Sequence, residues 1–454
     1  MTQGSSVPER SLVPTLRRDS RSAGDPNPVA VSATVLKRAR DLADQAAFLW
    51  SSRAFVARSS AVTFGALAAM DDRISRLVGA LGQKPGLAER LLDIDLGAFE
   101  AGHTFVTAVV ALRSGASGVL DHLVRRLEAR EELLTPLASA LSWFEYDEVS
   151  AWVEQLLSSS TPVVLRLGLV AAAAHGVGGA ALEQAVGAED SRLRATALEA
   201  VGRLGAGDLR SHLRAAFDDR DDACRFWGAW SAVRLGERAG LPVLGRFAMA
   251  GGRFAKPACD IALRALEPEQ AVAAQVRFAS VTSDQTLSVL TAGIVGDAAL
   301  VDSLLTRMEM ASLARHAAAA FCLMTGRDLR RDDLDGPPQQ LPAHQAIVAN
   351  SSEAGDGVQE PNGESDSDVV LDDADDLVWP DPVRIRQWWA ANSHAFVPGM
   401  RYLAGLPIGQ LELKAVLRAG NQQQRAAAAL ELGLLSPDAP LLDVTGPAHR
   451  QPAV

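Results

Sequence analysis

The feature that most constrains this chain is a helical pattern that recurs about every thirty residues. One copy, residues 221–236, opens on carboxylates that can cap a helix, continues as an alanine-rich apolar run and closes on a glycine. One helix pair cannot bury its apolar face alone, so recurrence at this period predicts a stack of helix pairs. The positions that punctuate the pattern are Gly115, Trp143/Phe144, Gly176, Gly205, Gly236, Glu267, Gly296 and Gly326.

The composition favours packed helices over sheets. It is 48% hydrophobic, contains only two tyrosines, and lacks the aromatic and β-branched enrichment typical of strands. Alanines in the apolar runs let helices approach one another closely, while leucine and valine supply the buried area. The sequence therefore predicts an all-α fold, an α-solenoid of about seven to eight helix pairs with a C-terminal helical cap.

Changes in composition predict the domain boundaries. Residues 328–376 carry fourteen acidic residues against two arginines and few apolar residues, which is typical of a disordered insertion. Residues 424–433 return to the arginine, alanine-run and glycine pattern of residues 315–326. The predicted parts are a disordered N-terminal tail (1–33), an N-terminal helical cap (34–96), the repeat array (97–327), the disordered acidic insertion (328–376) and a C-terminal helical segment that completes the array (377–450).

The net charge of −11 is unevenly distributed. The acidic insertion contributes −12 and residues 1–33 contribute +1, so the remaining residues are neutral overall. A neutral body offers no electrostatic footprint for nucleic acid, and no nucleic-acid partner is expected. Three distant cysteines without a CxxC pair, and the lack of an apolar run of about eighteen residues, predict a cytoplasmic protein that does not contact the membrane.

An arginine recurs near the start of successive helices. The structural interpretation of this arginine is an ion pair with a carboxylate of the neighbouring repeat, such as Asp190 or Asp221-Asp222, which would form a ladder along the stack. The four arginines of this predicted ladder are Arg166, Arg194, Arg225 and Arg315.

Aromatic residues set the copy at 221–236 apart from the other repeats. Phe226, Trp227 and Trp230 are not explained by the repeat, and the two tryptophans share one helix face near Arg225. One interpretation is an oversized core plug at a bend in the array. The other is a partner-binding site formed by these four residues, because tryptophan and arginine are enriched at interface hot spots.

The histidines, glycines and serines of the sequence form none of the common motifs of enzyme active sites. The eight histidines form no HxH, HExxH or His-Glu pair, so no metal is expected. The glycines of residues 176–179 follow a helix and lack the lysine of a phosphate-binding loop, and no GxSxG motif occurs. No catalytic residue and no cofactor are therefore predicted.

Three stretches carry a resemblance to a known family: residues 46–50 (AAFLW), residues 224–233 (CRFWGAWSAV) and residues 379–432, which include WPDP, WWAAN and QRAAAALEL. The repeat resembles the HEAT-like repeats of phycobilisome chromophore lyases. Together the stretches resemble a family of proteobacterial HEAT-like-repeat proteins of uncharacterised activity, over roughly residues 34–330 and 377–450. Members are often encoded beside type VI secretion genes, which implies an accessory or adaptor role.

The resulting functional prediction is a non-enzymatic scaffold or adaptor that binds an effector, a toxin or a secretion component. One alternative is an immunity protein that binds a single toxin. Another is an enzyme of lyase or DNA glycosylase type on the same scaffold, which would need a deep pocket where Trp227 or Trp230 meets a carboxylate and an arginine.

Overall fold

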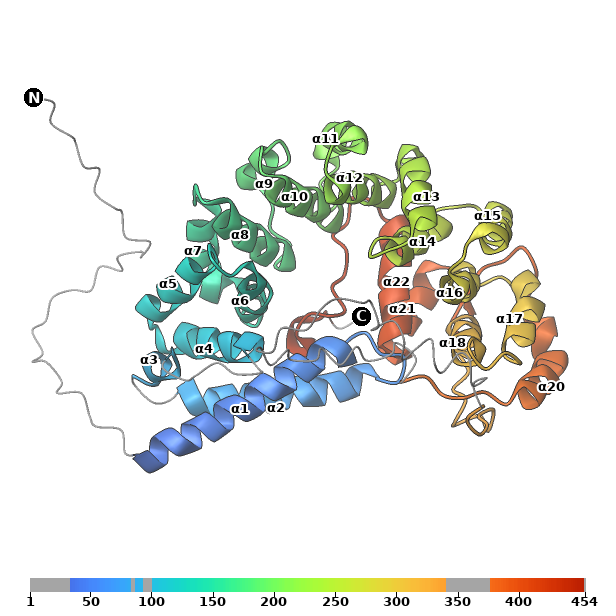
Figure 1. The fold of residues 1–454 in the computed structure, drawn as a ribbon, viewed down its shortest axis with the longest axis horizontal. Coiled ribbons are helices and arrows are strands. Elements are labelled where there is room, and N and C mark those ends of the chain that lie inside the picture. The colour runs from blue at the N-terminus through green and yellow to red at the C-terminus, as the bar shows by residue number, and fades with distance from the viewer. Residues whose placement is uncertain (1–32, 83–85, 93–99, 340–375, 453–454) are drawn as a thin grey trace, which may run out of the picture. The chain divides into compact units, whose positions relative to one another are not determined.

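The computed structural model describes residues 33–82, 86–92, 100–339 and 376–452 (Figure 1). The described residues form helices with one very short β-hairpin, so the predicted all-α class is confirmed. None of the described helices is long and apolar enough to cross a membrane. The predicted N-terminal tail up to residue 32 and residues 340–375 of the predicted insertion lie outside the described residues.

The chain divides into two units, which are described separately. Unit 1 comprises the residues up to Arg58, Val62–Gly240 and the C-terminal residues from Ser436; unit 2 comprises Ser59–Ala61 and Leu241–Leu435. The α-helices of unit 1 are α1 (Ala33–Val56), α2 (Phe64–Gly82), α3 (Leu87–Leu92), α4 (Glu100–Ser114), α5 (Ser117–Arg126), α6 (Leu134–Ser142), α7 (Tyr146–Leu157), α8 (Pro162–Ala174), α9 (Ala180–Ala185), α10 (Ser191–Leu204), α11 (Arg210–Ala215) and α12 (Asp222–Arg234).

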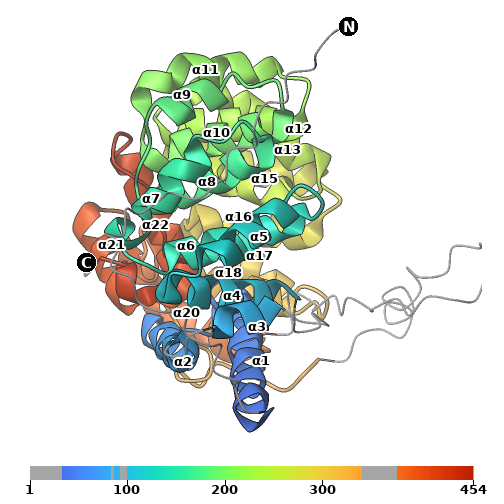
Figure 2. The ribbon, with the colours of Figure 1, turned by 90° about the vertical axis from the view of Figure 1, so that its left-hand side faces the viewer.

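Helices of unit 1 stack in chain order. Helix α4 packs on α6, α6 on α8, α8 on α10 and α10 on α12, as Figures 1 and 2 both show. Each of α7, α9 and α11 packs on the helix that follows it, and α1 and α2 pack on α4. This order, in which a helix contacts the one two places further along, is the order expected of stacked helix pairs.

Local sequence explains where the stacked helices begin and end. The carboxylates of Asp190 and Asp221 accept hydrogen bonds from the amides of Leu193 (2.7 Å) and Cys224 (3.0 Å), which caps α10 and α12. Helix α10 ends at Gly205, whose φ of +73° lies in the left-handed region that favours glycine. The predicted carboxylate start and glycine stop are therefore confirmed at α10.

Small residues allow the stacked helices of unit 1 to approach one another. Gly202 on α10 faces Ser231 on α12 so closely that a Cβ atom would collide with it. The Ser231 hydroxyl donates a 2.6 Å hydrogen bond to the carbonyl of Leu198. Between the helices the core is filled by fully buried side chains such as Phe105 and Leu198.

Unit 2 begins with a similar stack. Helix α13 packs on α14, α14 on α16, α16 on α18, and α17 on α18, while the later helix α22 packs on α21 and α14. The strands β1 (Tyr402–Leu403) and β2 (Leu406–Pro407) pair antiparallel. The α-helices of unit 2 are α13 (Leu241–Ala250), α14 (Ala255–Arg264), α15 (Pro268–Val281), α16 (Gln285–Val295), α17 (Val301–Arg307), α18 (Ala314–Thr325), α20 (Pro382–Asn392), α21 (Gln410–Ala419) and α22 (Gln422–Leu435).

In the predicted C-terminal helical region, residues 377–450, the α-helices end at Leu435, and only a short 3-10 helix (Ala448–Arg450) follows. Its helices α20, α21 and α22 belong to unit 2. Residues 436–452 form no α-helix and belong to unit 1 instead. The chain therefore returns, after completing unit 2, to the unit formed by its first 240 residues.

Candidate interaction surface

The aromatic residues predicted to bind a partner form one cluster on α12. The ring centroids of Phe226 and Trp227 lie 4.9 Å apart, and those of Trp227 and Trp230 lie 5.5 Å apart, both edge to face. Phe226 is fully buried and Trp230 is only 7% exposed, whereas Trp227 and Arg225 are half-buried. Of the four predicted residues, only Trp227 and Arg225 therefore present appreciable surface.

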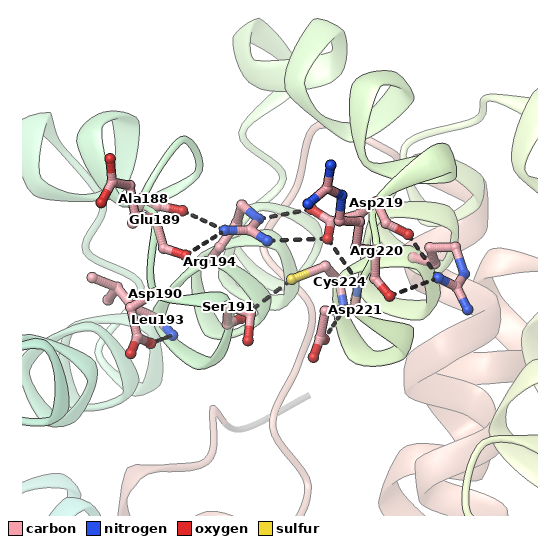
Figure 3. A network of polar contacts seen from close by, with 11 residues as sticks. Ala188, Glu189, Asp190, Ser191, Leu193, Arg194, Asp219, Arg220, Asp221 and Cys224 are labelled. Carbon is pink, nitrogen blue, oxygen red and sulfur yellow. Dashed lines mark hydrogen bonds and ion pairs between the residues drawn. The ribbon is translucent and has the colours of Figure 1, made fainter.

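Arg194, a member of the predicted ladder, joins two consecutive repeats (Figure 3). Its Nε and Nη2 atoms donate to the two carboxylate oxygens of Asp219 at 2.7 and 3.0 Å. Its Nη1 atom donates to the carbonyls of Ala188 and Glu189 in the turn before α10. The residue thus holds its own N-terminal turn and the corresponding turn of the next repeat.

Arg225 repeats half of this arrangement on α12. Its Nη1 atom donates to the carbonyls of Asp219 (2.7 Å) and Arg220 (3.1 Å), the turn residues equivalent to those held by Arg194. Its ion pair, however, is with Asp222 in the first turn of its own helix. Through these contacts Arg225 stabilises its own repeat.

The two outer arginines of the predicted ladder have different partners. Arg166 pairs with Glu131 (2.9 Å), which also pairs with Arg192 (2.6 Å). The hydrogen bond from Arg192 is the largest of the effects that lower the pKa of Glu131. Arg315, in unit 2, lies over the ring of Trp379 with its guanidinium carbon 4.9 Å from the centroid.

Two of the carboxylates expected to receive ladder arginines act as helix caps instead, and the third, Asp222, pairs with Arg225 of its own helix. Asp190 and Asp221 are both N-cap residues, and the acceptor for Arg194 is Asp219. Asp219 precedes the cap by two residues and also accepts a hydrogen bond from the amide of Asp221 (2.9 Å). Asp219 and Asp221 lie only two residues apart, so sequence alone does not show which of the two carboxylates faces Arg194.

We expect Arg194→Ala to lower the free energy of unfolding by about 1–2 kcal/mol, because a partly buried bidentate pair and a turn clamp are both lost. Urea denaturation at neutral pH measures the loss. Arg214→Ala is the matched control, since Arg214 also binds a carboxylate, Glu237, through two hydrogen bonds but is 64% exposed. A loss as large in the control would contradict the role assigned to Arg194.

The same pair gives an expected pH dependence. The hydrogen bond from Arg194 is the main cause that lowers the pKa of Asp219 from its usual 3.8. The stability that the pair contributes is therefore complete only well above 3.8, the pKa in the unfolded chain, and is lost as the pH falls through the lowered pKa of the folded state. The difference in stability between the wild-type protein and Arg194→Ala should shrink on acidification from pH 7 to pH 3.

Residues 436–452, here called the C-terminal segment, contact the C-terminal ends of the stacked helices in unit 1 (Figure 1). Arg234, the last residue of α12, donates to the carbonyls of Pro437 (3.1 Å) and Ala439 (2.6 Å). The amide of Leu441 donates to the carbonyl of Arg203 in the last turn of α10 (2.6 Å). The segment thereby satisfies carbonyl and guanidinium groups at helix ends.

Further along, the C-terminal segment reaches α8, α6 and α2. The guanidinium of Arg450 donates to the carbonyls of Ser142 (2.7 Å) and Ala174 (3.3 Å), the last residues of α6 and α8. A cation at this position is favourable because the C-terminal end of a helix carries partial negative charge. The amide of Ala448 donates to Asp71 on α2 (2.8 Å).

Arg53 on α1 fixes the bend of the C-terminal segment. It donates to the carbonyls of Thr445 and Gly446, both at 2.8 Å, and pairs with Asp71. Both Arg53 and Asp71 are buried. Arg53 and Arg234 therefore bind the C-terminal segment mainly through its main-chain carbonyl groups.

Two cavities lie between the C-terminal segment and the helices α8 and α10, with volumes of about 270 and 250 Å³. Arg203 and Asp443 line both, and His175 and Arg450 line the larger one. Burial, helped by the positive charge of Arg450, lowers the pKa of His175 to about 4, so its ring is neutral at pH 7. A third cavity of about 370 Å³ lies between α1 and α3. None of these three cavities is lined by the aromatic residues of α12.

Metal-binding and thiol chemistry find little support in the parts of the chain that the structure describes. In those ranges no group of three histidine, cysteine or acidic side chains could hold a metal ion. Cys224 donates to the carbonyl of Ser191 (3.2 Å), and burial raises the pKa of its thiol to about 12. A thiol with so high a pKa stays protonated at neutral pH and is a poor nucleophile.

Sequence reasoning missed the arginines that attach the C-terminal segment to unit 1, namely Arg53 and Arg234 on the helices and Arg450 within the segment. One signal was present. The sequence indicates Gly205 only as the end of a helix. In the structure, a Cβ atom at this position would in addition lie 2.7 Å from the carbonyl oxygen of Asp438. Glycine is needed at this position for its left-handed φ and because another segment of the chain packs against it. The sequence indicates only the first of these two reasons.

Comparison with known proteins adds no assignment: no protein-family model matches the chain, and no curated protein is similar enough to match it.

Proposed function

We propose that this protein is a non-enzymatic scaffold or adaptor that binds a partner protein. The observation that carries the proposal is that unit 1 holds a length of polypeptide, the C-terminal segment, across the ends of four stacked helices. Arg53 and Arg234 recognise carbonyl groups, which every polypeptide possesses. A helix stack with this chemistry is suited to binding an extended segment of another protein.

The setting of the proposal comes from the sequence resemblance alone. It points to type VI secretion or effector handling, with an immunity protein as the alternative. The two roles differ in what the protein should bind. An adaptor should bind a secretion component or several effectors, whereas an immunity protein should bind a single toxin.

The test is affinity capture with the tagged full-length chain from its native host. We expect one or a few specific proteins at near-stoichiometric level, and no such protein would contradict the proposal. Trp227→Ala should reduce this capture at least about tenfold if Trp227 is an anchor at the interface. Trp152→Ala on α7, which removes another half-buried tryptophan of unit 1, is the control that should retain the partner.

A further inference from the structure

We propose that the end of the α13–α14 helix pair in unit 2 binds an acidic segment of the partner protein. This inference rests on the proposed function and names the chemistry of the partner. The surface, here called the basic end, consists of Arg246, Phe247, Met249, Arg253, Phe254 and Lys256. Residues 241–259 contain these three cations and no carboxylate.

The three cations of the basic end are available for an external ligand. Arg246, Arg253 and Lys256 are all exposed. None of them forms an ion pair or a side-chain hydrogen bond with any residue that the structure describes. Arg253 does lie over its neighbouring ring, with its guanidinium carbon 4.5 Å from the centroid of Phe254. Other arginines of unit 2, such as Arg264 and Arg386, are paired with carboxylates.

The fold brings the cations to one end of the helix pair. Arg246 lies about one turn before the end of α13, and Lys256 lies in the first turn of α14. Gly251 and Gly252, with φ angles of +77° and +74°, form the turn between the helices. Each arginine is followed by a phenylalanine, and the rings of Phe247 and Phe254 pack edge to face at 5.5 Å.

The basic end also departs from the repeat pattern in its charge. Helices α10, α12 and α16 are capped by Asp190, Asp221 and Asp284. The equivalent position of the repeat before α14 is occupied by Gly252, which has no side chain that could cap the helix. Helix α14 has no side-chain cap, and its first turn contains Lys256 but no acidic residue. The N-terminal end of a helix carries partial positive charge, so a cation there is unfavourable unless an anion is close by. In the other three helices an aspartate offsets this charge, whereas in α14 Lys256 adds to it.

An acidic peptide fits this surface better than nucleic acid does. The basic end is confined to three cations at the end of α13, in the following turn and in the first turn of α14, whereas binding to a phosphate backbone requires a longer stripe of cations. Met249, which is 51% exposed, offers apolar contact to a hydrophobic residue within an acidic segment.

The test is fluorescence anisotropy with a labelled twelve-residue peptide of glutamate and aspartate that contains one leucine and one phenylalanine. The protein itself carries a net charge of −11, so attraction of this probe must come from a local surface. We expect saturable binding by the full-length protein that weakens about tenfold or more when NaCl is raised from about 50 to 300 mM.

A pair of triple variants localises the binding. Arg246→Ala/Arg253→Ala/Lys256→Ala should weaken it at least about tenfold. Arg73→Ala/Arg76→Ala/Lys414→Ala removes the same types of exposed cation at other places and should bind like wild type. Thermal melts of both variants should match the wild type, because the substituted side chains make no described ion pair.

Three outcomes would overturn the inference: no binding of the acidic peptide by the wild type, equal binding by the first triple variant, or tighter binding of a single-stranded DNA probe that this variant loses. Affinity capture separates this inference from the proposed function. A specific partner that is recovered equally by the wild type and by the first triple variant supports the scaffold and contradicts the basic end as its binding site.

Discussion

Glu431→Gln should lower the free energy of unfolding of unit 2 by about 3–5 kcal/mol, because it leaves two buried cations without their shared carboxylate. Glu431 on α22 is only 2% exposed. Its Oε1 atom accepts hydrogen bonds from Arg264 on α14 (2.8 Å) and from Arg401 in the loop before β1. Burial lowers the pKa of Arg401, and the charge of Glu431 opposes this effect, so the carboxylate compensates the cost of burying the guanidinium.

Arg401 shows why this loss should spread through unit 2. Its guanidinium also donates to the carbonyls of Arg264 and Val295, each at 3.0 Å, which lie at the ends of α14 and α16. Arg450 joins the ends of α6 and α8 in unit 1 in the same way. In both units an arginine from the C-terminal part of the chain therefore satisfies the last carbonyls of two stacked helices.

Chemical denaturation followed by circular dichroism measures the effect of Glu431→Gln. The matched control is Glu309→Gln, which makes the same change in an arginine pair whose two side chains are more than half exposed. The control should lose less than about 1 kcal/mol. Equal losses in the two variants would show that burial of the Glu431 pair has no energetic consequence.

Truncation after Leu435 is the second large change, and we expect it to destabilise unit 1 by at least about 3–6 kcal/mol, from about 1.5–3 kcal/mol for each of the two buried arginines, Arg53 and Arg234, that lose charge-assisted hydrogen bonds. Arg53 and Arg234 lose their carbonyl acceptors, and the ends of α6 and α8 lose Arg450. Differential scanning calorimetry should show a fall of roughly 10 °C in the Tm of unit 1. Removing only residues 452–454 is the control and should leave the Tm unchanged.

A synthetic peptide of residues 436–452 sharpens the truncation experiment. Added in excess, it should restore part of the lost Tm if the segment binds unit 1 as a separable peptide. Gly205→Ala gives an independent check. In the full-length chain the new methyl group would meet the Asp438 carbonyl at 2.7 Å, whereas in the truncated chain only the cost of the left-handed φ remains. An equal cost in both backgrounds would contradict the placement of the segment against α10.

Local features of this protein could be predicted from its sequence. The carboxylate caps at Asp190 and Asp221 and the glycine stop at Gly205 follow from hydrogen bonding and backbone conformation within a few residues. The all-α class follows from repeating these signals about every thirty residues with alanine-rich faces between them. Phe226, Trp227 and Trp230 were also recognised as exceptions to the repeat. Their sequence did not decide between core and interface, because burial depends on what packs against the helix.

The tertiary structure alone decided which distant groups meet. It selected Asp219 as the partner of Arg194, returned the C-terminal segment to unit 1, and buried Glu431 between Arg264 and Arg401. These contacts join residues that lie from about twenty-five to several hundred positions apart, and no local propensity encodes such a pairing. The unfilled carbonyls at the helix ends accept any well-placed donor, so only the path of the folded chain determines which arginine or amide reaches them.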